Sequence, residues 1–330
     1  MSTRAAGLLA ILAGLALVLL LSVSVGARPI GVAEVWSLVW QPDGSDDAII
    51  VHDLRIPRTI LGLVVGAALG VGGALMQALT RNPLADPGLL GVNAGAAAAV
   101  VTATAIIGVT SPLVHVWFAF AGAAVASVVV YAVGAAGRSG ATPIRLALAG
   151  TAITFALYAY VHALILIDRD TLDLYRFWQV GALAGHDAAL SAQIAPFVVA
   201  GILLAFALGR PLNAIGLGDE AGRALGASLA RTRVLSGIAI TLLCGAATAA
   251  VGPIVFIGLT VPHVARAITG PDQRWVLPYS ALLAPVLLLA ADVIGRVVNR
   301  PGELEVGIVS AVLGAPVFIA IVRRRRIAQL

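Results

Sequence analysis

Apolar blocks about as long as a membrane-crossing helix recur along this chain, and they limit its fold more than any other feature. A helix needs about 20 predominantly apolar residues to cross a hydrocarbon layer about 30 Å thick. Charged residues make up only 11% of the 330 residues, whereas a soluble domain carries about 25%. The sequence therefore predicts an all-α, polytopic membrane protein.

We expect about ten transmembrane helices in a single domain over residues 1–330. The first apolar block is too long for the hydrophobic core of a signal peptide, so we expect it to be retained as a helix. The seventh and eighth blocks run together, and we place a turn at Gly252-Pro253, because one helix over both would exceed the bilayer thickness. The ten spans are predicted at residues 5–26, 59–80, 88–109, 113–136, 143–167, 189–209, 233–252, 253–270, 276–298 and 305–322.

The 21 basic residues are all arginine, and their distribution predicts how the chain is oriented. With the N-terminus inside, 14 of them fall on one side of the membrane and 7 on the other. Cytoplasmic loops carry an excess of basic residues, so we expect both termini on the cytoplasmic side of the inner membrane. Six spans over 5–209 then precede a cytoplasmic segment at 210–233, and four spans over 233–322 precede a basic tail at 323–330.

The chain lacks the motifs by which a transporter would power itself. A phosphate-binding G-x-x-x-x-G-K-[ST] loop requires a lysine, and the sequence has none. Asp292 is the only carboxylate well inside a predicted span, and Arg296 one turn later favours a structural pair over a proton relay. No cysteine and histidine cluster has the spacing of a metal site. We therefore predict no catalytic residue, no bound cofactor and no metal, and we expect a separate protein to supply the energy.

Residues 210–233 form the longest charged interruption in the second half of the chain. Such a segment cannot lie in hydrocarbon. Asp219 is suited to cap a short helix, and Gly226 is suited to end one. The segment is either an ordinary solvated loop or the place where another protein docks.

Linked motifs follow one another along essentially the whole chain. They are Arg55-Ile-Pro-Arg58, Gln77-x-x-x-Arg81-Asn82-Pro83, Phe177-Trp178-x-x-Gly181, Gly218-Asp219-Glu220, Pro262-His263-x-x-Arg266, Ala291-Asp292-x-x-x-Arg296 and Gly314-Ala315-Pro316. In this order and at this spacing the chain resembles the FecCD/BtuC family, the permease subunits of ABC importers for ferric siderophores, haem and vitamin B12. One departure is Glu305, where members of the family often carry proline after Glu-Leu.

The resemblance implies a BtuC-like fold and a set of partners. These are a cytoplasmic ABC ATPase dimer that holds ATP and magnesium, a second permease subunit, either a copy or a paralogue, and an extracytoplasmic siderophore-binding protein. The family's coupling segment, which would enter a groove on the ATPase, matches Gly218, Asp219, Glu220, Ala221, Arg223, Leu225 and Gly226.

The resemblance also implies roles at the two membrane surfaces. Arg55, Arg58 and Arg296 are expected to project at the outer face and to receive carboxylates of the binding protein, because a guanidinium pairs bidentately with a carboxylate. The alternative is a structural role, in pairs with Asp53 and Asp292 or with lipid headgroups.

At the cytoplasmic mouth, two prolines enforce a non-helical link between the second and third spans. Gln77, Asn82, Pro83 and Asn93 are predicted to form a gate or to line the pathway. The alternative is a rigid turn whose polar side chains satisfy the freed backbone groups. His263 is expected to be a structural hydrogen-bonding residue and not a metal or proton site.

Our hypothesis for the function is a permease that moves a ferric siderophore inward by alternating access. Haem and vitamin B12 remain as alternative cargoes of the same family. A secondary carrier driven by an ion gradient is the competing class, and the lack of buried acids argues against it. Nucleic acid is not an expected partner, because the arginines lie at membrane boundaries.

Overall fold

The computed structural model describes residues 3–109, 111–136, 142–224, 226 and 228–323, and helices without any strand make up this part of the chain. One helix lies in each of the ten predicted spans. They are α1 (Thr3–Ser24), α4 (Ile56–Thr80), α5 (Val92–Ala105), α6 (Pro112–Ala135), α7 (Pro143–Ile167), α9 (Ala188–Ala207), α12 (Leu229–Val251), α13 (Ile257–Thr269), α14 (Gln273–Val298) and α15 (Val306–Arg323).

Within the described residues, seven helical stretches are long and apolar enough to cross a membrane, and the seven include one stretch of 35 residues over Asp46–Thr80. The chain is thus a multi-pass membrane protein. Two of the ten helices are shorter than the predicted spans by five residues or more, because α5 has 14 residues and α13 has 13. The prediction that these helices begin at residues 88 and 253 is therefore wrong.

The late start of α13 has a physical cause in the turn predicted at Gly252-Pro253. Gly252 has a φ of 74° and follows the last residue of α12. A Cβ on Gly252 would lie 2.1 Å from the carbonyl oxygen of Trp178, so only glycine fits there. The chain then runs without helix to Phe256, so the turn is confirmed and the helix resumes four residues later than predicted.

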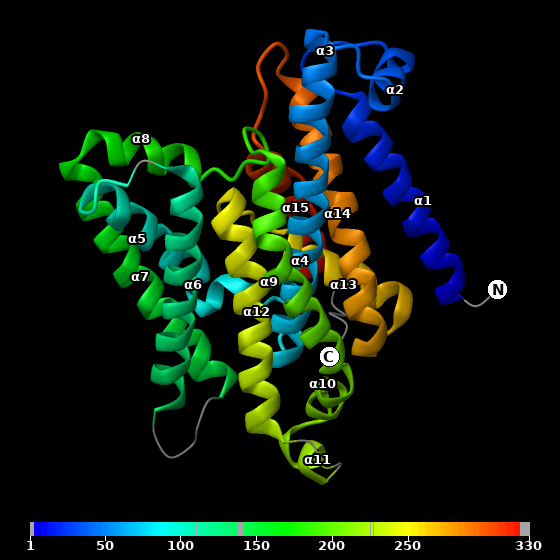
Figure 1. Cartoon of the computed structure of the whole chain (residues 1–330). Coiled ribbons are helices and arrows are strands. Elements are labelled where there is room, and N and C mark those ends of the chain that lie inside the picture. Colours follow the sequence, from blue (N-terminus) through cyan, green and yellow to red (C-terminus); the bar gives the residue numbers. More distant parts are fainter. Residues whose placement is uncertain (1–2, 110, 137–141, 225, 227, 324–330) are drawn as a thin grey trace.

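Short helices mark the two ends of the bundle (Figure 1). At the end that we call the outer end lie α2 (Val32–Trp40), α3 (Asp46–Ile49) and α8 (Arg169–Trp178). At the inner end lie α10 (Gly209–Gly216) and α11 (Asp219–Ala224). Two further short elements are the π-helix η1 (Ile50–Arg55) and the 3-10 helix η2 (Pro87–Leu90). The inner end is the one that the arginine distribution predicts to be cytoplasmic.

Small residues let α4 pass through the centre of the bundle in close contact with α13 and α14. A Cβ on Gly66 would lie 2.6 Å from Cα of Pro285, and one on Gly70 would lie 2.4 Å from the carbonyl oxygen of Ser280. A Cβ on Gly73 would lie 2.0 Å from the carbonyl oxygen of Gly258. Backbone thus packs on backbone, which is how small residues drive association of membrane helices.

Gly73→Ala is expected to destabilise the protein by about 1–3 kcal/mol, because the new methyl group must push α4 away from α13. The matched control is Gly14→Ala in α1, where an added Cβ meets no atom within 4 Å. Unfolding of the purified protein in detergent measures both variants. Equal stability of the two variants would contradict the close packing of α4.

Candidate functional site

A buried carboxylate organises the outer end of the bundle. Asp292 in α14 is fully buried. Arg58 in α4 donates to it from Nη2 at 2.7 Å and from Nε at 3.1 Å. Arg296 donates to it from Nε at 3.0 Å and also from Nη2. One negative charge therefore faces two guanidinium groups inside the protein.

The other nitrogens of this cluster also have partners. Arg58 Nη1 donates to Glu303 at 2.6 Å. Arg296 Nη1 donates to the carbonyl oxygen of Ser22 at 2.7 Å. Arg55 does not pair with Asp53 but donates to backbone carbonyl oxygens, including that of Ser24 at 2.8 Å. The end of α1 and the segment after it thus supply the acceptors that allow arginine to be buried.

The expectation that three arginines project from the outer face is wrong. The exposed fractions of Arg55, Arg58 and Arg296 are 4%, 8% and 1%. The structural pairing with Asp292 is confirmed for Arg58 and Arg296. Docking of a binding protein on these residues remains a prediction.

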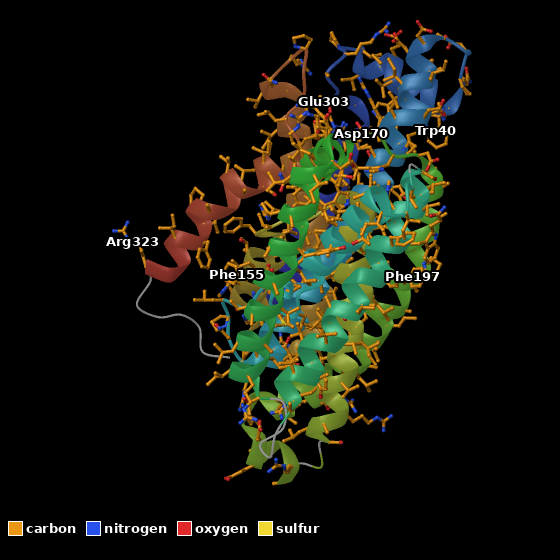
Figure 2. All side chains as sticks on the ribbon, turned by 90° about the vertical axis from the view of Figure 1, so that its left-hand side faces the viewer. Trp40, Phe155, Asp170, Phe197, Glu303 and Arg323 are labelled. Atoms are coloured by element: carbon orange, nitrogen blue, oxygen red, sulfur yellow. The ribbon has the colours of Figure 1, made fainter. Side chains whose placement is uncertain are left out.

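A cavity of about 380 Å³ lies directly above this cluster at the outer end. The three buried arginines line it together with Arg28 and Glu303. The side chain of Arg28 is 56% exposed and that of Glu303 is 29% exposed, so these two residues reach the surface. Figure 2 shows Glu303 at this end of the molecule.

The link between α4 and α5 is held by its own polar side chains. Arg81 ends α4 with a φ of 51°. Asn82 Oδ1 accepts from the backbone N–H of Leu84 at 2.9 Å, and Asp86 Oδ1 accepts from that of Gly88 at 2.8 Å. These contacts support the interpretation of the link as a rigid turn.

Two of the predicted gate residues form hydrogen bonds with neighbouring helices. Pro83 offers its carbonyl oxygen to His263 Nε2 at 2.9 Å, which confirms the structural role expected for His263. Asn93 Oδ1 accepts from Thr248 Oγ1 in α12 at 3.0 Å. These bonds join the inner link to α12 and α13, and a role of the residues in a gate remains a prediction.

Gln77 is completely buried between α4 and α13. Its Nε2 donates to the carbonyl oxygen of Leu259 at 3.0 Å, and its Oε1 accepts from Nη2 of Arg266. Arg266 is 6% exposed, and its Nε and Nη1 have no hydrogen-bond partner among the described residues. Gln77 thus provides the hydrogen bond that holds a buried and incompletely satisfied guanidinium.

Gln77→Leu is expected to lower the stability by about 1.5–3 kcal/mol, the range for a hydrogen bond to a charged group. The control is Gln41→Leu at the exposed outer end, which should leave stability unchanged. Chemical denaturation of the two purified variants provides the comparison. A Gln77→Leu protein as stable as the control would show that Arg266 finds other partners.

At the inner end, α11 is tied to two long helices through Asp219. Its Oδ2 accepts from Arg233 Nη2 in α12 at 2.8 Å. Its Oδ1 forms an ion pair with Arg81 Nη2 at the end of α4, at 3.2 Å. Asp219 is the first residue of α11, and its carboxylate pairs with both arginines. We refer to this arrangement as the Asp219 tie.

The charge of Asp219 is secured by its surroundings. Burial alone would raise the pKa of its carboxyl group, but the hydrogen bond and the charge of Arg233, with the charges of Arg81 and Arg223, hold the pKa below its ordinary value. The carboxylate therefore stays ionised at neutral pH, and the tie is lost only as the pH falls through that lowered value.

The other coupling residues face outward or shape the backbone. Glu220 and Arg223 are exposed, and Ala221 is half-buried. Gly218 and Gly226 have φ of 107° and 81°, and Gly226 follows the end of α11 as predicted. Leu225 lies outside the described residues.

A second connection at the inner end was not apparent from the sequence. Asn213 in α10 donates to Asp272 Oδ1 at 2.6 Å and accepts from the backbone N–H of Gln273 at 2.8 Å. It joins α10 to the start of α14. The partners are about 60 positions apart in the chain, so no local pattern in the sequence could have paired them.

The chain is similar to known transport proteins in sequence and in fold. The sequence profile of the FecCD transport family matches residues 14–324. The chain is 47% identical over 324 residues to the ferric enterobactin transport system permease protein FepD of Escherichia coli (strain K12), covering 98% of this chain and 96% of that protein. It is 42% identical over 306 residues to the Fe(3+)-citrate import system permease protein YfmD of Bacillus subtilis (strain 168), covering 93% and 91%.

Two further similarities extend the range of relatives. The hemin transport system permease protein HmuU of Yersinia pestis is 36% identical over 325 residues, with 95% of each chain covered. A solved structure described as an inward-facing metal-chelate type ABC transporter has a TM-score of 0.84 and 24% identity, covering 97% of this chain and 99% of that one. The latter similarity establishes the fold.

Proposed function

This chain belongs to the FecCD transport family, and on that premise we propose that it is the permease subunit of an ATP-driven importer for a ferric siderophore. The cargo crosses inward by alternating access, and a separate subunit hydrolyses ATP. Relatives named for enterobactin, citrate and haem transport support an iron chelate as cargo. The identity to the enterobactin permease, 47%, exceeds that to the haem permease, 36%, and favours a siderophore over haem.

The Asp219 tie is the observation that carries this proposal. An importer without its own ATPase must receive force from outside, and α11 offers exposed Glu220 and Arg223 to a partner. The tie connects α11 to α4 and α12, so that a push on α11 reaches the centre of the bundle. In this proposal Glu220 and Arg223 contact the ATPase, and Asp219 transmits its movement.

The outer cavity is the proposed contact of the binding protein. Its four arginines outnumber the three acids that pair with them, Asp47, Asp292 and Glu303, and the remaining positive charge suits a carboxylate brought by a partner. Arg28 makes the first contact because it is exposed. Arg55, Arg58 and Arg296 support it from below.

A second permease subunit is proposed to cover apolar faces of α7 and α15. Ile144, Leu148 and Phe155 on α7 are 73%, 66% and 71% exposed. In Figure 2, α15 leads away from the bundle toward Arg323. Val312 on α15 is 66% exposed.

Uptake of a radiolabelled ferric siderophore tests the proposal. Cells that lack siderophore uptake would express this chain with an ATPase and a binding protein encoded beside it. We expect uptake to vanish when the ATPase is withheld. Uptake by this chain alone, abolished by a protonophore, would instead establish the secondary carrier.

A further inference from the structure

A large cavity opens at the inner end of the bundle, far from the outer arginines and separate from α11. Its volume is about 720 Å³, within the range of sites that bind small molecules. The first turns of α1 form one wall, and the turn between α13 and α14 forms the other. The residues that define it here are Arg4, Leu8, Ile268, Thr269, Trp275 and Tyr279.

Arg4 is fixed at the rim of this cavity by three contacts. Its Nη2 donates to the carbonyl oxygen of Thr269 at 3.0 Å. Its guanidinium carbon lies 5.2 Å from the centre of the Trp275 ring, in a cation–π contact. The hydroxyl group of Tyr279 donates to the carbonyl oxygen of Arg4. A guanidinium has five N–H donors, so the positioned group can still donate toward the cavity.

The cavity lies where two spans begin. The apolar stretch of α1 covers Arg4–Ser24, and that of α14 covers Gln273–Val298. Arginine, tryptophan and tyrosine at the ends of spans occupy the level of the lipid headgroups. Trp275 is 39% exposed and forms an edge-to-face contact with Tyr279. The site therefore faces the boundary between headgroups and hydrocarbon.

The cavity also has an apolar floor. Leu8 and Ile268 line it from opposite walls. The walls meet at Gly7, where a Cβ would lie 2.6 Å from Cγ2 of Ile268. A polar rim above a narrowing apolar floor matches a phosphate group with an acyl chain attached.

We infer that this cavity binds an anionic phospholipid of the leaflet at the inner end. The phosphate accepts from Arg4, the exposed ring of Trp275 contacts the glycerol region, and an acyl chain lies against Leu8 and Ile268, while the buried Tyr279 holds the backbone of Arg4 in place. The lipid fills the space between α1 and the α13–α14 turn. The excess of arginine at the inner end draws anionic lipid to this surface.

Quenching of Trp275 by brominated lipids tests the site. The purified full-length chain in nonionic detergent would be titrated with brominated phosphatidylglycerol or brominated phosphatidylcholine. Subtraction of the Trp275→Phe signal isolates Trp275 from the other four tryptophans. We expect half-maximal quenching at an about fivefold lower concentration of phosphatidylglycerol, the equivalent of about 1 kcal/mol.

Variants that remove one arginine at a time give the control. Arg4→Gln is expected to abolish the fivefold preference, and Arg4→Lys to retain most of it because the charge remains. Arg145→Gln removes a predicted inner-side arginine outside the cavity and should leave the preference intact. The proposal is overturned if both lipids quench alike, if Arg145→Gln has the same effect as Arg4→Gln, or if Arg4→Lys behaves as Arg4→Gln. Displacement of the lipid by an equal concentration of inorganic phosphate would also overturn it, because a small-anion site would then suffice.

Discussion

Asp292→Asn is expected to lower the free energy of unfolding by about 3–5 kcal/mol, the cost of leaving a buried charge without its partner. Asp292 is the fully buried acceptor for both Arg58 and Arg296. Asparagine keeps the shape but removes the negative charge. Two guanidinium groups would then face each other, with only the half-exposed Glu303 to offset them.

The matched control is Asp173→Asn at the same end of the molecule. Asp173 pairs with Arg176 at 3.2 Å, but both side chains are more than 60% exposed. Exposed pairs contribute little to stability, so the control should have the same free energy of unfolding as the wild type. Denaturation in detergent, followed by tryptophan fluorescence, measures both proteins. An Asp292→Asn protein as stable as the control would mean that the cluster does not hold α4 to α14.

Asp219→Arg is expected to reduce siderophore uptake at least about tenfold, the equivalent of about 1.4 kcal/mol in coupling. The substitution places a third guanidinium beside Arg81 and Arg233, and like charges at this distance repel. The tie between α11 and the two long helices is lost. The ATPase should still bind through Glu220 and Arg223, so its co-purification with the permease should persist.

Two variants separate transmission from docking. Glu220→Arg should weaken co-purification of the ATPase while leaving the Asp219 tie intact. Asp173→Arg, a charge reversal at the outer end, should change neither property. Membrane insertion of every variant is checked by immunoblot. If Asp219→Arg transports normally, α11 is tied to the bundle for stability alone.

Features with a local signature were predictable from the sequence. The spans follow from runs of apolar residues, and the turn at Gly252-Pro253 follows from the length limit of a single helix. Gly66, Gly70 and Gly73 follow one another at intervals of four and three residues, a local pattern typical of close helix packing, and they lie against α13 and α14. The pair of Asp292 and Arg296 was visible because it spans one helical turn.

Long-range pairs were beyond the reach of sequence patterns. Arg58 and Asp292 are 234 positions apart, and Gln77 and Arg266 are 189 apart. Only the packing of α4 against α13 and α14 brings them together. Arginines at the ends of spans were expected to be exposed, but carbonyl oxygens in the last turn of α1 accept from them and allow them to be buried.

The family resemblance identified the coupling segment as a block, and the structure divides it. Asp219 was expected to cap a helix, because aspartate does so often. Its carboxylate instead lies between Arg81 and Arg233, which come from helices far apart in the sequence. The division into an inward-facing Asp219 and an outward-facing Glu220 could only come from three-dimensional contacts.

Transport into proteoliposomes without any ion gradient tests the central claim most directly. The purified permease, with its partner permease where one is required, would be reconstituted with the ATPase, and radiolabelled ferric siderophore would be presented on its binding protein. ATP would be supplied only on the ATPase side. The account predicts uptake that requires ATP and ATPase and is lost in Asp219→Arg. Uptake driven by an ion gradient with the ATPase absent would contradict it.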